Sequence, residues 1–174
     1  LYVGYAGDAV GNATANGNAL TLTNQYGYMN VASSQTNASD VTAEGYVTLG
    51  GDWLGFAAAS SYGVGNAATL SNVGSDTVLA TDQTNSGDVR SYAALAGDGG
   101  VTGLASSAAY GNVVTGGLCG TCGDAASGPS LSASNYQNNS GAVESVTNVR
   151  SGRVGSVAAS ATAVGNAAAY SVTQ

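Results

Sequence analysis

The stretch Gln83-Thr84-Asn85-Ser86-Gly87-Asp88-Val89 organises the chain, because it occurs three times in related form. The other two copies are Gln35-Thr36-Asn37-Ala38-Ser39-Asp40-Val41 and Gln137-Asn138-Asn139-Ser140-Gly141-Ala142-Val143. A Gly-Asn pair alternates with this motif, at Gly11-Asn12, Gly65-Asn66, Gly111-Asn112 and Gly165-Asn166. Two unlike motifs that recur roughly every 50 residues indicate a repeat architecture. Such repetition is typical of a scaffold or a surface.

The composition is poor in charge and excludes several functions. Only 7% of the 174 residues are charged, against about 25% in ordinary globular chains. The cations are Arg90, Arg150 and Arg153, and the net charge is −7. Because phosphates need a basic surface, we expect no nucleic-acid partner.

The chain gives signals about its location. No apolar run approaches 18 residues, so no membrane span is predicted. The chain begins at Leu1 without an initiator Met, which predicts either a processed, exported protein or a truncated piece. Two nearby cysteines fit an oxidising compartment. We therefore expect an extracellular or cell-surface protein.

Alternating side chains predict an all-β fold. Between Asp40 and Leu49, the side chains of Val41, Ala43 and Val47 share one face and polar side chains share the other. This period of two is typical of a half-buried strand, and helix signals are nearly absent.

Distances around the turns favour an antiparallel meander. With Gly51, Ser75, Asp98 and Ser151 as turn tips, the motif asparagines lie at similar distances on either side of each tip. We therefore predict about seven long, bent strands in a sandwich-like or long twisted sheet. A parallel β-solenoid is the alternative, in which the distance from turn to asparagine would be constant.

The repeats predict one domain over residues 1–174. Imperfect repeats lie near 35–82, 83–136 and 137–174. Residues 1–34 would form an N-terminal strand and a candidate donor segment for a neighbouring copy. Residues 13–34 are interpreted as a long connection, or as an extra hairpin around Asn16-Gly17.

The residue types argue against catalysis and bound cofactors. Without His or Lys, the Ser-His-Asp, Cys-His and Ser-Lys arrangements are impossible. Asp40, Asp82 and Asp88 are interpreted as solvated turn carboxylates, and we predict neither a catalytic nor a metal site. We expect a loop disulfide between Cys119 and Cys122, with two free thiols as the alternative. The predicted structural asparagines are Asn12, Asn37, Asn66, Asn85, Asn112, Asn139 and Asn166.

These motifs resemble a known family. Gln-Thr-Asn-Ser-Gly-Asp-Val at 83–89, together with Ala-Val-Gly-Asn-Ala at 163–167, is similar to bacterial holdfast-anchor proteins of the HfaD type. The chain is more distantly similar to curlin, a fibre subunit. The resemblance implies a secreted, surface-attached adhesive or fibre-forming protein without catalytic residues.

The sequence as a whole predicts a structural subunit of an extracellular bacterial filament or cell-surface anchor. Copies would assemble into a homopolymer by β-strand pairing, since few Lys, Arg or Pro residues protect the strand edges. Other surface-anchor proteins or polysaccharide are further expected partners. The alternative is a carbohydrate-binding adhesin or spike module that acts as a discrete particle.

Overall fold

The computed structural model of the chain describes residues 1–120, 122 and 128–173. Every strand pairing in the described residues is parallel, so the predicted antiparallel meander is wrong. Successive windings of the chain stack on one another instead. This arrangement agrees with the parallel β-solenoid that was the alternative.

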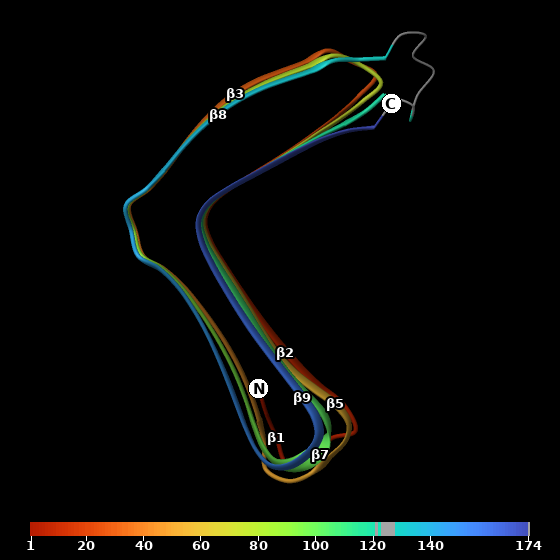
Figure 1. Ribbon diagram of the computed structural model, residues 1–174, viewed down its shortest axis with the longest axis vertical. Coiled ribbons are helices and arrows are strands. Elements are labelled where there is room, and N and C mark those ends of the chain that lie inside the picture. The colour runs from red at the N-terminus through yellow and green to blue at the C-terminus, as the bar shows by residue number, and fades with distance from the viewer. Residues whose placement is uncertain (121, 123–127, 174) are drawn as a thin grey trace.

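In the described part of the chain, nine strands form two curled sheets. They are β1 (Tyr2–Val3), β2 (Ala9–Gln25), β3 (Met29–Asn37), β4 (Val41–Leu49), β5 (Trp53–Val73), β6 (Thr77–Asn85), β7 (Val89–Cys119), β8 (Leu131–Asn139) and β9 (Val143–Thr173). The larger sheet has the order β1-β4-β7-β5-β2, with β9 also on β7, and the smaller has the order β3-β6-β8. In Figure 1 the successive windings lie almost over one another.

Each winding is flattened, with two walls that face each other (Figure 1). Among the residues that the structure describes, the long wall has four levels: β2, β5, the second half of β7, and residues 157–173 of β9. The register that joins them runs from Ala9 to Ala57, Gly103 and Val157. The facing wall contains β3, β6 and β8 as its first, second and third levels. Further along the chain, the same wall continues with β4 at the first level. The first half of β7 continues the second level, and the first half of β9 continues the third.

The Gly-Asn pairs mark a local break in the long wall. The paired register passes over Gly17, Gly65, Gly111 and Gly165 while their neighbours stay matched. A methyl group on Gly65 would collide with Oδ1 of Asn85 and the carbonyl oxygen of Gly111. Glycine is therefore required at this position by the close approach of neighbouring atoms.

Several predicted turns lie inside strands. Asp98 and Ser151 fall within β7 and β9, and Asn16-Gly17 falls within β2 and forms no hairpin. Equal arms around a turn do not require antiparallel strands. The two walls of a flattened winding also have similar lengths, so the distances on both sides of a turn match in a parallel coil as well.

The interior contains small apolar clusters separated by polar layers. Trp53 packs with Val47, Leu49 and Leu95, and its Nε1 donates to the carbonyl oxygen of Thr102 at 2.9 Å. A second cluster contains Met29, Leu70, Leu79 and Val114, and a third contains Val41, Val89 and Ala109. Because many core residues are alanine or valine, apolar burial per residue is small. No helix in the described part of the chain has the length and apolar character needed to cross a membrane.

Candidate functional site

The Gln-x-Asn asparagines form a ladder inside the facing wall. Asn37 donates to Oδ1 of Asn85, and Asn85 donates to Oδ1 of Asn139, each at 2.7 Å. Each of the three also donates to the carbonyl oxygen two residues later, at 2.7–2.8 Å. Asn85 is fully buried. The ladder therefore connects the windings and fixes the corner that follows each motif.

The glutamines of the same motif form a second ladder of opposite direction. Gln137 donates to Oε1 of Gln83 at 2.8 Å, and Gln83 donates to Oε1 of Gln35 at 2.6 Å. Each glutamine also donates across the interior to a main-chain carbonyl of the long wall, on Ala67, Val113 or Ala167. This ladder joins the two walls as well as the windings.

The long wall has its own asparagine ladder, and its first member differs from the prediction. Asn18 donates to Oδ1 of Asn66, Asn66 to Oδ1 of Asn112, and Asn112 to Oδ1 of Asn166, each at 2.8 Å. The predicted Asn12 is paired with Ser60 and lies outside this ladder. Asn18 was missed because Gly11-Asn12 looks like the other Gly-Asn motifs. Asn18 and Asn66 are 48 residues apart, as are Asn37 and Asn85. This shared spacing is the sequence signal that identifies Asn18.

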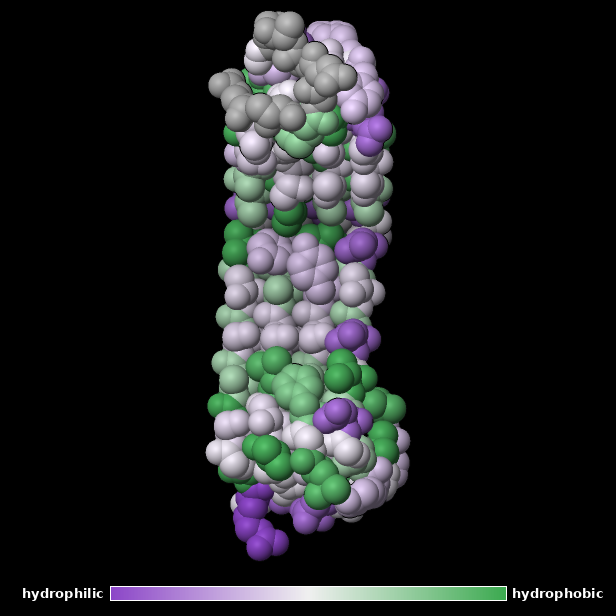
Figure 2. Space-filling view, turned by 90° about the vertical axis from the view of Figure 1, so that its right-hand side faces the viewer, coloured by the Kyte–Doolittle hydropathy of each residue, from purple (hydrophilic) through white to green (hydrophobic). Residues whose placement is uncertain are grey.

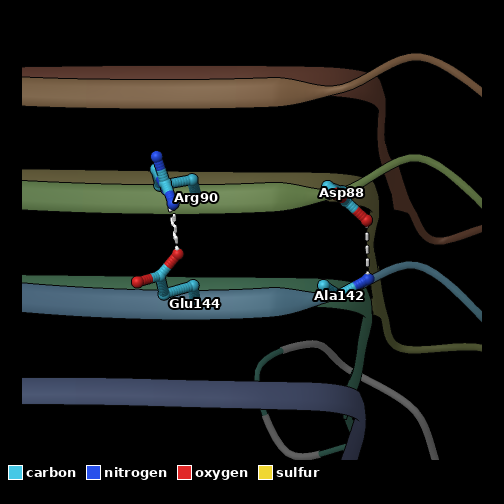
Figure 3. Close-up of polar contacts among 4 residues, drawn as sticks. All are labelled: Asp88, Arg90, Ala142 and Glu144. Carbon is cyan, nitrogen blue, oxygen red and sulfur yellow. Dashed lines mark hydrogen bonds and ion pairs between the residues drawn. The ribbon is translucent and has the colours of Figure 1, made fainter.

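The turn carboxylates cap main-chain groups of the following winding. The N–H of Asp88 donates to Oδ1 of Asp40 at 2.9 Å. In the same way, the N–H of Ala142 donates to Asp88 at 2.8 Å, as Figure 3 shows. Beside them Arg90 and Glu144 form an exposed ion pair at 2.7 Å. The hydrogen bond and charge of Glu144 raise the pKa of Arg90. In the described residues, no three metal-ligating side chains gather into a site.

The two cysteines lie at the end of the third level of the long wall. Cys119 and Cys122 are joined by a disulfide, with Cα atoms 5.4 Å apart. Cys119 ends β7, and its carbonyl oxygen accepts from Gly74 at 2.8 Å. The bond therefore lies beside the stacked turns, and residues 121 and 123–127 of this loop lie outside the described residues.

Comparison with known families matches residues 1–88 to holdfast attachment protein D (HfaD). The chain belongs to this family. The family's role is holdfast attachment, which places the chain at the cell surface. No curated protein and no solved structure matches the chain, and nothing supports the likeness to curlin.

The ladders of this HfaD-family chain end in complementary polar groups. At the first level, no donor side chain in the described residues reaches Oδ1 of Asn18 or Asn37. At the other end, Asn139 and Asn166 each have an N–H that no ladder partner in the described residues accepts, and Oε1 of Gln137 has no donor among those residues. Gln35 has a matching spare N–H at the first level. Each end thus has the groups that the opposite end lacks.

Tyrosines and apolar side chains mark the outer surface of the HfaD-family chain. Tyr46 packs on Tyr92, and Tyr62 packs on Tyr110, with ring centroids 5.4 and 5.7 Å apart. Burial, and then the charge of Tyr110, raise the pKa of Tyr62. Figure 2 shows apolar side chains gathered towards the lower end of one face. The exposed apolar residues include Leu54, Phe56, Val101 and Val157.

Proposed function

We propose that this HfaD-family chain is a structural subunit of an extracellular filament or cell-surface anchor. Copies assemble end to end by β-strand pairing. The complementary ends of the amide ladders are the observation that carries this proposal. Among the described residues, β8 pairs only with β6, and residues 157–173 pair only with β7, so one edge of each is open. An open edge is a template for another chain.

The proposal includes a secreted homopolymer without catalytic activity. The absence of His and Lys from the sequence supports the proposed lack of catalytic activity. Other surface-anchor proteins and polysaccharide are its further partners. The low content of Lys, Arg and Pro supports edges that accept a partner.

Gly165→Ala is the variant that tests assembly. In the isolated chain, a methyl group at Gly165 would lie 3.6 Å from Nδ2 of Asn139, an ordinary contact. At the equivalent Gly65 and Gly111, the methyl would collide with the carbonyl oxygen of the next glycine in the long wall. A further copy stacked on residues 157–173 would bring such a carbonyl to Gly165. The variant should therefore fold normally and fail to assemble.

Sedimentation and negative-stain imaging of the full chain measure whether each variant assembles. Gly117→Ala is the matched control, because the nearest atom to its methyl is Oγ of Ser171 at 3.7 Å. We expect filaments from the parent chain and from Gly117→Ala, and monomers from Gly165→Ala. A parent chain that stays monomeric at every concentration, or a Gly165→Ala variant that polymerises normally, contradicts end-to-end assembly.

Pairs of neighbouring tyrosines favour a second candidate function, a carbohydrate-binding adhesin that acts as a discrete particle. Tyr46 is 46% exposed and packs on Tyr92, and flat aromatic surfaces suit sugar rings. Tyr46→Ala with Tyr92→Ala should reduce co-sedimentation with holdfast polysaccharide. Tyr136→Ala, at an exposed tyrosine of the facing wall, is the control. Equal binding by the parent, the double variant and the control rejects this candidate.

A further inference from the structure

We infer that copies join by strand exchange, in which residues 157–173 of one copy replace β2 of the next. This inference rests on the proposed assembly and specifies its geometry. In the joint, β3 of the next copy pairs with β8, and β4 of the next copy pairs with the first half of β9. The segment 157–173 then pairs with β5 of the next copy. The next copy's β1 and β2 are displaced together, because β1 pairs with the edge of β4 that meets the first half of β9 in the joint.

The two exchanged segments are equivalent in structure and sequence. The register connects Ala9 with Val157 and Gln25 with Thr173, through β5 and β7. Both segments contain Ala-Thr-Ala-x-Gly-Asn-Ala, at 13–19 and 161–167, whereas the two levels between them have Ser61 and Ser107 at its first position. Either segment can therefore occupy the first level of the long wall.

A rigid stack of two complete copies would leave a gap. The long wall has four levels, whereas β3, β6 and β8 provide three. If β2 of the next copy lay on residues 157–173, its β3 would stand two levels from β8, about 9.6 Å away. Two strand edges would then remain unpaired inside the joint. Exchange removes the redundant level and closes this gap.

The hydrogen bonds of Asn166 show which partner it lacks. Asn18, Asn66 and Asn112 each donate to the carbonyl oxygen of the residue just before a Gln-x-Asn asparagine, at 2.8–2.9 Å. Asn166 instead reaches the carbonyl of Gln137 at 3.4 Å, because the fourth level has no such residue among those described. Exchange places Thr36 of the next copy at that position, and a rigid stack does not.

Buried small side chains also match across the exchanged joint. At the second and third levels, the inner faces of the two walls meet through hydroxyl pairs, Ser61 with Ser91 at 2.6 Å, and Ser107 with Ser145. The equivalent residues at the first level are Ala13 and Ala43. At the fourth level the residue is Ala161. Exchange puts Ala161 opposite Ala43 of the next copy, so no hydroxyl is buried without a partner.

The charges of Asp52 and Arg153, beside the start of the long wall, also favour strand exchange. Trp53, Gly100 and Val154 are matched in register, so Asp52, Gly99 and Arg153 lie at successive levels. Exchange brings Asp52 of the next copy beside Arg153. In the rigid stack that neighbour is Tyr5, because Ala6 pairs with Trp53. The opposite charges add specificity to the joint.

Two cysteine pairs in the full chain distinguish the arrangements. Ala32 and Ser134 are exposed, and Ala80 lies between them in a single copy. In one copy they are about 9.6 Å apart, which is too far for a disulfide. Exchange makes them direct neighbours between copies. Thr14 and Thr162, exposed at the first and fourth levels, become neighbours only in the rigid stack.

Both double variants, Ala32→Cys/Ser134→Cys and Thr14→Cys/Thr162→Cys, are oxidised during assembly and run on non-reducing gels. We expect covalent oligomers from the first pair and almost none from the second. Oligomers from the second pair alone overturn exchange and leave the proposed assembly intact. Filaments without crosslinks from either pair also overturn exchange. Monomers throughout contradict the proposed function itself.

Discussion

The side-chain amide of Asn85 donates to Oδ1 of Asn139 at 2.7 Å across 54 residues of sequence. The same amide donates to the carbonyl of Gly87, and its Oδ1 accepts from Asn37 at 2.7 Å. Asn85 is fully buried, so none of these partners can turn to water without a rearrangement. One side chain thus connects three windings.

Asn85→Ala should therefore be strongly destabilising. It leaves buried donors and acceptors on both neighbouring windings, each worth about 1–3 kcal/mol when unsatisfied. We expect a loss of about 3 kcal/mol in the free energy of unfolding, measured by urea denaturation. Asn138→Ala is the control, because that side chain is exposed. Similar stabilities for the two variants would show that the ladder contributes little.

The sequence contains a constant spacing that indicates the parallel register. Asn18 and Asn66, Asn24 and Asn72, Gln35 and Gln83, Asn37 and Asn85, and Asp40 and Asp88 are all separated by 48 residues. A constant difference between paired positions means parallel strands, whereas antiparallel strands keep a constant sum. The all-β class could be predicted from the alternation of side chains. Distances around the turns do not reveal the strand direction, because parallel and antiparallel arrangements give similar distances there.

Other features could not be predicted from local sequence. The spacing changes from 48 to 46 and then 54 along the long-wall ladder, because successive windings differ in length. This variation concealed the common register and favoured Asn12 over Asn18. The opposite directions of the asparagine and glutamine ladders depend on how the walls face each other. That information exists only in the folded chain.

Gly65→Ala should destabilise the fold at the break in the long wall. Its methyl would overlap Oδ1 of Asn85 and the carbonyl of Gly111, and that Oδ1 cannot move without losing the ladder bond from Asn37. We expect a loss of about 1–3 kcal/mol, as for overpacked cores. In dilute monomer, Gly165→Ala should unfold like the parent because its methyl has room. Equal thermal midpoints for both variants would contradict the steric argument.

Trp53→Phe should weaken the apolar cluster at the curled end. Trp53 is 1% exposed, and loss of Nε1 leaves the carbonyl oxygen of Thr102 without its donor. The smaller ring also leaves space against neighbouring Leu49 and Leu95. We expect a loss of about 1–3 kcal/mol in urea denaturation. Leu54→Ala is the control, since Leu54 is 66% exposed and should change stability by less than about 0.5 kcal/mol.

Asp76 should make stability sensitive to acid. The backbone N–H and then the hydroxyl of Ser130 donate to its carboxylate and lower its pKa. Because the folded pKa lies below the unfolded value, the contribution is present above about pH 4 and is lost as pH falls through the folded pKa. In Asp76→Asn, the urea midpoint should therefore fall less between about pH 5 and pH 2 than in the parent. Asp98→Asn, at an exposed carboxylate outside such a cap, should follow the parent profile. Identical slopes for the parent and Asp76→Asn would mean that the bonds from Ser130 do not favour the ionised carboxylate in solution.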